Sequence, residues 1–93
     1  MYIALRSSTG CTIEKNVDYP HNDVNDGLED KQPDMISCRT YCKSQNVDYF
    51  AWHAADSPAF DYRNSCWCKT DLPSDNKTDQ NGVISGETMC NGN

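Results

Sequence analysis

The stretch SCWCKT, Ser65–Thr70, contains two cysteines separated by a single residue, Cys66 and Cys68. On a β-strand both sulfurs would point to the same face, about 6.6 Å apart. A second pair, Cys38 and Cys42, has helical spacing, which also places two side chains on one face, about 6 Å apart. We therefore expect a helix that lies across a sheet and is pinned to it by two parallel disulfides. The spacing leaves open whether Cys38 bonds to Cys66 or to Cys68, because the helix can run in either direction along the strand.

The small hydrophobic fraction agrees with a disulfide-stabilised fold. The chain has 93 residues, enough for one domain, and only 37% of them are hydrophobic, a fraction that includes six cysteines. A core this small usually needs covalent staples, and an even number of cysteines at this density favours a secreted protein. Zinc sites need thiolate pairs spaced C-x(2–4)-C, which only Cys38 and Cys42 approach, and a nucleophilic cysteine needs a base, for which only His21 and His53 are available. We therefore predict no metal, no cofactor and no catalytic residue.

The charge of the chain disfavours two classes of partner. The formal net charge is −6, from 14 acidic and 8 basic residues, and the basic residues are not clustered. Nucleic acids and anionic membrane surfaces both require clustered Lys and Arg. No apolar run approaches the roughly 20 residues that span a bilayer. We predict no nucleic-acid binding and no membrane insertion.

The first ten residues, MYIALRSSTG, lack the basic region, the long apolar region and the cleavage site of a signal peptide. Because the cysteines indicate secretion, we interpret the chain as one module taken from a longer exported protein. Residues 1–10 are then a linker or an appended extension, residues 11–90 are the domain, and residues 91–93 are a C-terminal tail.

One helix is expected within PDMISCRTYCKSQN, residues 33–46. Proline is tolerated at a helix entry, and the Asp34 side chain can cap the first N–H groups. Asn46 is a suitable C-terminal stop because Asn tolerates a left-handed backbone.

The remaining regular structure is expected to be strands, because the segments are rich in β-branched and aromatic residues. The expected strands cover residues 11–19, 47–54, 65–71 and 82–90. In the second of them, alternation places Phe50, Trp52 and Ala54 on one face. His53 lies on the other face. Both faces are partly apolar, which favours a central strand covered by a helix.

The segment DVNDG, residues 23–27, resembles a calcium-binding EF-hand loop only superficially. Asp23, Asn25 and Asp26 are one residue short of the EF-hand register, and Pro33 stands where a bidentate Glu is expected. We interpret these side chains as turn formers.

Taken together, these segments resemble the PAN/apple family. The resemblance is carried by Cys11, DYPHND at 18–23, the C-x3-C of the helix, YFAWHA at 49–54, CWCK at 66–69, and GVISG followed by Cys90. It implies an α+β fold in which a curled antiparallel sheet of about five strands surrounds one α-helix. It also implies three nested disulfides: Cys11–Cys90, Cys38–Cys68 and Cys42–Cys66.

The CWCK segment points to one branch of that family. Vertebrate apple modules, such as those of plasma prekallikrein and coagulation factor XI, carry a cysteine just before the aromatic strand and usually a Leu where Cys68 stands. The present pattern looks like the apple modules of apicomplexan microneme proteins, the adhesins that parasites such as Eimeria and Toxoplasma secrete during host-cell attachment.

The resemblance implies a non-catalytic adhesive module, secreted through the microneme organelle and repeated in tandem. Its partner would be a host-cell surface receptor or glycan, or another secreted adhesin. A galactose-type lectin is the alternative, and an enzyme or a metal-binding domain is a remote one. Fold resemblance alone does not identify a ligand.

Sugar sites combine an aromatic ring with fixed polar groups, as small-molecule pockets do in general. Suitable residue types are offered by Trp52, His53, Tyr62, Arg63, Trp67 and Lys69. Trp52 fits the core better, and Trp67 and Lys69 point away from the two strand cysteines. The candidate ligand-binding residues are Trp67, Lys69, Arg63 and His53.

Overall fold

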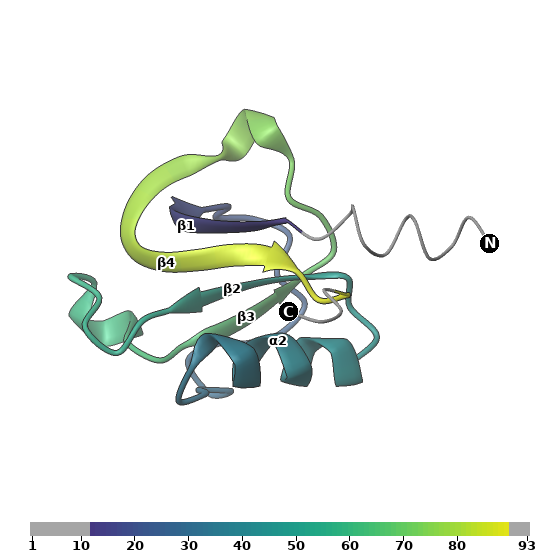
Figure 1. The fold of residues 1–93 in the computed structure, drawn as a ribbon, viewed down its shortest axis with the longest axis horizontal. Helices are drawn as coiled ribbons and strands as arrows, with labels where there is room; N and C mark the ends of the chain where they lie inside the picture. The colour runs from purple at the N-terminus through teal and green to yellow at the C-terminus, as the bar shows by residue number, and fades with distance from the viewer. Residues whose placement is uncertain (1–11, 90–93) are drawn as a thin grey trace.

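The computed structural model describes residues 12–89, which form a four-stranded antiparallel sheet with one α-helix packed against it (Figure 1). The strands are β1 (Ile13–Asp18), β2 (Tyr49–His53), β3 (Cys66–Lys69) and β4 (Thr78–Glu87), in the spatial order β1-β4-β2-β3. The helix, α2, is Met35–Ser44, and two 3-10 helices, η1 (Phe60–Tyr62) and η2 (Ser74–Asn76), lie in the connections. The α+β class is confirmed, but the described sheet has four strands instead of about five. Within residues 12–89, no helix has the length and apolar character needed to cross a membrane.

Several expectations concern the two ends of the chain and lie outside the described residues. These are the extension at residues 1–10, the tail at residues 91–93, and the disulfide between Cys11 and Cys90.

The helix begins and ends at the residues that the sequence indicates. Asp34 is the N-cap, with an extended backbone, and its carboxylate accepts a hydrogen bond of 2.7 Å from the N–H of Ser37. Gln45 is the C-cap, and Asn46 follows with φ of +61°, the left-handed conformation in which helices commonly stop.

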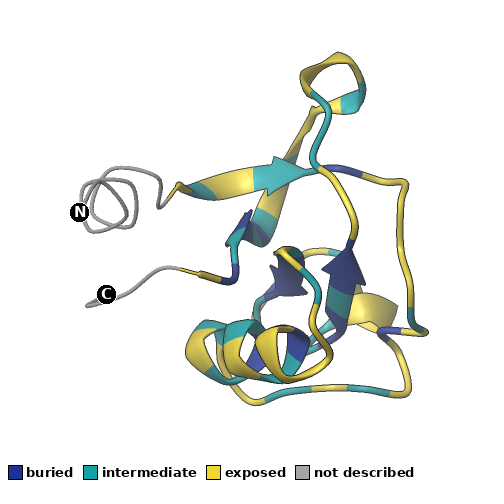
Figure 2. Cartoon of the chain, turned by 90° about the vertical axis from the view of Figure 1, so that its right-hand side faces the viewer, coloured by how far each residue is buried: buried dark blue, intermediate teal, exposed yellow. Residues whose placement is uncertain are grey.

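The core lies between α2 and the sheet, and Figure 2 shows the buried side of the helix turned toward the strands. Strand register places Phe50 opposite Cys68 and Trp52 opposite Cys66, so all four side chains face α2. The indole N–H of Trp52 donates to the carbonyl of Gln32 at 2.9 Å, which pairs its one polar group. The central buried cluster consists of Cys38, Cys42, Phe50, Trp52, Cys66 and Cys68.

Two disulfides join α2 to β3 within this core. They pair Cys38 with Cys66 and Cys42 with Cys68, with Cα–Cα distances of 5.4 and 5.2 Å. The pairing implied by the family resemblance, Cys38–Cys68 and Cys42–Cys66, is therefore wrong. The physical reason is the direction of the helix: α2 runs along β3 so that the earlier helix cysteine meets the earlier strand cysteine. The two bridges are adjacent, with 3.8 Å between the sulfurs of Cys42 and Cys66.

A loop covers the outer edge of β3 in place of a fifth strand. The Asn25 side chain accepts a hydrogen bond from the N–H of Cys68 at 2.8 Å and donates to the carbonyl of Cys66 at 3.0 Å. Backbone bonds run from Val24 N–H to the Cys68 carbonyl and from Cys66 N–H to the Gly27 carbonyl. The edge of β3 is thus paired without a regular strand. An open edge would expose unpaired N–H and C=O groups with which a strand of another chain could pair.

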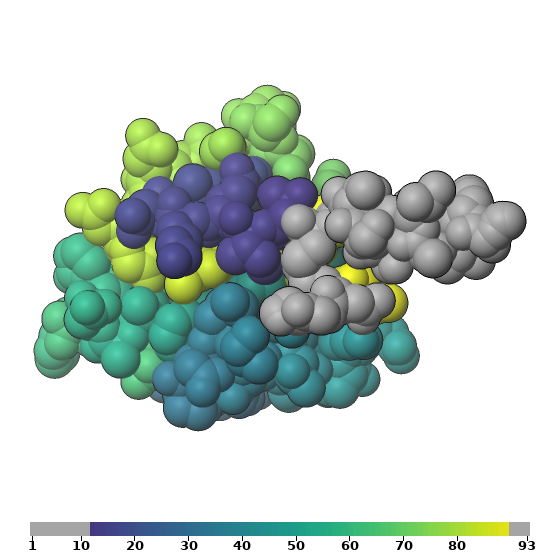
Figure 3. All heavy atoms as spheres, viewed as in Figure 1, coloured from purple at the N-terminus to yellow at the C-terminus, as the bar shows by residue number. Residues whose placement is uncertain are grey.

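The last strand begins earlier than expected and bends in its middle. β4 starts at Thr78, not at residue 82, because the polar residues that the sequence assigns to a loop pair with the end of β1. The strand turns at Gly82, whose φ is +83°, and the Asn16 side chain accepts a hydrogen bond from the Gly82 N–H at 2.9 Å. The curve is visible in Figure 1, and η2 projects at the end of the molecule opposite α2 (Figure 3).

Replacing Asn25 by Ala is expected to lower the free energy of unfolding by about 1–3 kcal/mol, because the N–H of Cys68 loses its partner and the carbonyl of Cys66 loses the Asn25 amide. Urea denaturation measures this difference. Glu29→Ala is the matched control, since Glu29 is exposed in the same loop. Equal stabilities of the two variants would show that Asn25 does not hold the loop on β3.

The double variant Cys38→Ala/Cys66→Ala removes one bridge and leaves the other, so we expect a loss of about 2–4 kcal/mol. The crossed variant Cys38→Ala/Cys68→Ala removes one partner from each bridge and is expected to be less stable. Urea denaturation without reductant, combined with thiol labelling, compares them. A crossed variant that is the more stable of the two would contradict the pairing described above.

Candidate functional site

A pocket of about 330 Å³ lies on the face of the sheet opposite α2. Its walls come from the end of β1 and the loop after it, from β2 and β3, from η1 with the residue before it, and from the bend of β4. The lining residues are Asp18, Pro20, Asp23, His53, Ala59, Tyr62, Trp67, Lys69 and Gln80.

The pocket brings together three of the four candidate residues. Successive side chains of a strand point to opposite faces. Because Cys66 and Cys68 face the helix, Trp67 and Lys69 point to the other side, as the sequence predicts. His53, at the end of β2, lines the same pocket.

Arg63, the fourth candidate, does not line the pocket. Its Nε donates to the carbonyl of Ser57 at 2.8 Å, and its guanidinium carbon lies 4.8 Å from the centroid of the Phe60 ring. Arg63 therefore supports η1 from beside the pocket, and η1 in turn supplies Tyr62 to the pocket wall.

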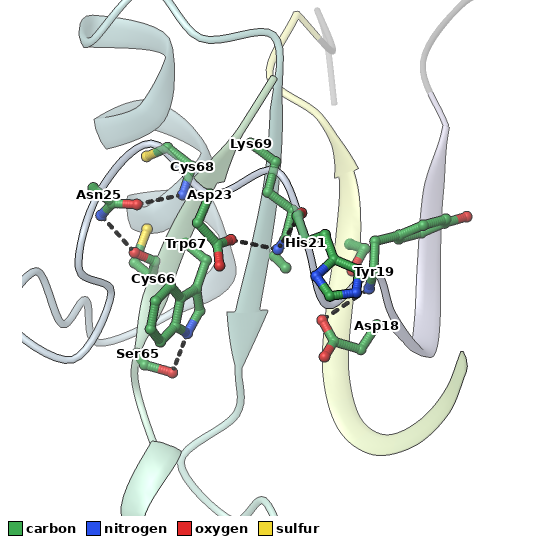
Figure 4. Close-up of polar contacts among 12 residues, drawn as sticks. Asp18, Tyr19, His21, Asp23, Asn25, Ser65, Cys66, Trp67, Cys68 and Lys69 are labelled. Atoms are coloured by element: carbon green, nitrogen blue, oxygen red, sulfur yellow. Dashed lines mark hydrogen bonds and ion pairs between the residues drawn. The ribbon is translucent and has the colours of Figure 1, made fainter. Parts of the chain in front are cut away.

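Lys69 provides a fixed positive charge in the pocket. The residue is 2% exposed, and its Nζ donates to Asp23 at 2.5 Å and to the carbonyl of His21 at 3.2 Å (Figure 4). A lysine ammonium has three N–H donors. Two of them are used by Asp23 and the His21 carbonyl, and the third has no acceptor among the described residues. Lys69 is buried whereas Asp23 is partly exposed, so Asp23 is the partner that compensates the buried charge and holds the ammonium in place.

Three aromatic rings line one wall. The Tyr62 and Trp67 rings lie 6.1 Å apart and 26° from parallel, and His53 lies 5.3 Å from Tyr62. Trp67 is held by a 2.9 Å hydrogen bond from its indole N–H to the Ser65 hydroxyl. A Cβ at Gly27 would lie 2.4 Å from Cδ2 of Trp67, so the loop backbone packs directly over the indole. Tyr62, 42% exposed, is therefore the ring most open to a ligand.

His53 is a buried imidazole with an unpaired nitrogen. It is 6% exposed, and its Nδ1 has no hydrogen-bond partner among the described residues. Burial lowers the pKa of His53 below its usual value; the negative charges of Asp18 and Asp23 oppose this shift, and the charge of Lys69 adds to it. The imidazole is therefore neutral at neutral pH.

Sequence reasoning missed three polar residues of the pocket, Asp18, Asp23 and Gln80, and it named Tyr62 as a suitable residue type without including it among the candidate residues. Asp18 and Asp23 are the first and last residues of the DYPHND segment, which carries part of the family resemblance. The sequence therefore contained a feature that could have drawn attention to them. No local signal marks Gln80, because only the bend of β4 brings it to the pocket.

The segment that resembles a calcium loop uses its side chains within the fold. Asp23 pairs with Lys69, and the amide of Asn25 bonds to β3. Asp26 accepts a hydrogen bond from the N–H of Leu28 at 3.0 Å. These contacts fit the interpretation of the segment as a turn.

The sulfurs of Cys38, Cys42 and Cys66 lie within 4.8 Å of one another, a spacing that can hold a metal ion. All three belong to disulfides. Metal ions bind the thiolate form of cysteine, and a disulfide sulfur is not a thiolate. This cluster therefore serves as a covalent cross-link between α2 and β3.

No model of a known protein family matches the chain, and no curated protein matches it. The assignment to the PAN/apple family therefore remains a proposal, which rests on the residues that carry the resemblance.

The free energy of unfolding is expected to fall as the pH drops from 7 through 6.5, the usual pKa of His, because the unfolded chain then binds a proton that buried His53 does not. His53→Gln removes this contribution and should flatten the dependence. Urea denaturation at several pH values measures it, with His21→Gln, an exposed position, as the control. An unchanged pH dependence in His53→Gln would show that His53 does not contribute to it.

Proposed function

We propose that this chain is a non-catalytic, carbohydrate-binding adhesive module of PAN/apple type from a secreted protein. The observation that carries the proposal is the pocket, which an accessible aromatic ring and fixed polar groups line together. Its volume of about 330 Å³ is at the lower end of the roughly 300–1,000 Å³ of small-molecule sites, which suits a single sugar ring.

Each kind of group in the pocket has a counterpart on a sugar. The Tyr62 ring offers a surface for the apolar C–H face of the sugar. The remaining N–H of Lys69 donates to a hydroxyl oxygen, while Asp23 accepts from a hydroxyl and Gln80 can do either. The ion pair between buried Lys69 and partly exposed Asp23 holds the ammonium in place before the ligand arrives, which reduces the entropy cost of binding. A neutral hexose of galactose type is the ligand that the family resemblance favours.

The disulfides support a secreted location, because such bonds persist in oxidising compartments. The CWCK resemblance extends the proposal to a microneme adhesin that acts in host-cell attachment, with a surface receptor or glycan, or another adhesin, as partner. A single small pocket binds weakly. Tandem repetition would raise the strength of attachment through effective concentration.

Protein–protein adhesion is the second candidate function. It is favoured by an apolar rim beside the pocket, formed by Phe60, which is 70% exposed, and Tyr62. Exposed aromatic residues are typical anchors of protein interfaces.

Titration of the protein with galactose, followed by backbone amide NMR shifts, tests the proposal. We expect millimolar binding that moves the amides of Trp67, Lys69 and His53 and is lost in Tyr62→Ala. Phe60→Ala is the matched control, because Phe60 lies in the same 3-10 helix but does not line the pocket. Shifts confined to other parts of the chain, or no shifts with any neutral sugar, would reject the lectin function and favour protein adhesion.

A further inference from the structure

The pocket holds more negative charge than positive charge. Two carboxylates line it, those of Asp18 and Asp23, together with one ammonium, that of Lys69. His53 is neutral at neutral pH because it is buried. Asp23 and Lys69 form an ion pair with 2.5 Å between Oδ1 and Nζ, so each charge compensates the other. The negative charge of Asp18 is therefore the one charge of the pocket that no lining residue compensates.

Asp18 forms no ion pair with a described residue, whereas the other carboxylate of the pocket, Asp23, is paired with Lys69. Its Oδ1 accepts a hydrogen bond of 2.9 Å from the N–H of Tyr19, which fixes the carboxylate at the end of β1 (Figure 4). The residue is half-buried, so water screens its charge only in part.

The positive charge of Lys69 does not offset this surplus for an incoming anion. A carboxylate or sulfate that accepted the remaining N–H of Lys69 would lie beside the carboxylate of Asp23, which already neutralises that ammonium, so the two anions would repel each other. The net charge of the whole chain, −6, acts in the same direction at longer range.

We infer that the pocket selects its ligand by charge: it accepts a neutral or amine-bearing sugar ring and rejects one that carries a carboxylate or a sulfate, with Asp18 as the residue that determines this specificity. The inference rests on the proposed carbohydrate-binding function and narrows its substrate class. Uronic acids, sialic acids and sulfated sugars are excluded as ligands of this pocket.

Three probes that share one ring test the selection: galactose, galacturonic acid and galactosamine, each titrated at neutral pH and followed by amide NMR shifts. A like charge at several ångströms in a partly screened site weakens binding on the order of tenfold. We therefore expect galacturonic acid to bind on the order of tenfold more weakly than galactose. Galactosamine should bind at least as tightly as galactose.

The Asp18→Asn variant isolates the responsible group. Asn keeps the side-chain oxygen that accepts from Tyr19 and removes only the charge. The ratio of galactose to galacturonic acid affinity should fall on the order of tenfold in this variant. Asp75→Asn is the matched control, because it changes the net charge equally from η2, outside the pocket, and should leave the ratio unchanged.

The outcomes separate the two proposals. If none of the three sugars binds, the carbohydrate-binding function fails and the charge selection fails with it. If galactose and galacturonic acid bind equally well, the lectin function stands and the charge selection is overturned. If Asp75→Asn changes the ratio as much as Asp18→Asn does, the assignment to Asp18 is overturned.

Discussion

The two disulfides between α2 and β3 fix the register of β3 and the direction in which its side chains point. They lie at the centre of a core in which four of the six buried residues are the bridged cysteines. Because both sulfurs of β3 are bonded to the helix, that strand cannot slip by one residue without breaking both bridges. The same bonds decide which side chains of β3 face away from the helix. Stapling one face of the sheet thus places Trp67 and Lys69 on the other.

A single loop completes both the edge of the sheet and the wall of the pocket. Asn25 pairs with β3 on the edge, and Asp23, two residues earlier, pairs with Lys69 in the pocket. Gly27 fits because its backbone lies directly over the ring of Trp67, where a Cβ has no room. A regular fifth strand would satisfy the same edge. The irregular loop does so while it also turns a carboxylate toward the buried lysine.

Buried polar groups distinguish the pocket face from the helix face. The helix face is lined by disulfides and aromatic rings, whereas the pocket face holds a buried lysine and an imidazole whose Nδ1 has no partner among residues 12–89. Such groups lower stability unless they are paired, and each unpaired one in a native structure calls for an explanation. A ligand that supplies hydroxyl groups would explain the unpaired polar groups on this face. The same ligand would explain why these groups line a concave pocket.

Local spacing was enough to predict the helix with its Asp34 cap and Asn46 stop, the strand character of all four strands, and the opposite directions of the cysteines and Trp67 on β3, while the start of β4 was placed four residues too late. The disulfide pairing could not be predicted in this way, because the direction of the helix along β3 is set by packing and not by the spacing of the cysteines. The same holds for the pocket. Asp18, Asp23 and Gln80 are distant in the chain from Lys69, and the loop over β3 and the bend of β4 bring them to it. Local sequence encodes which face a side chain takes, whereas long-range packing decides which side chains meet there.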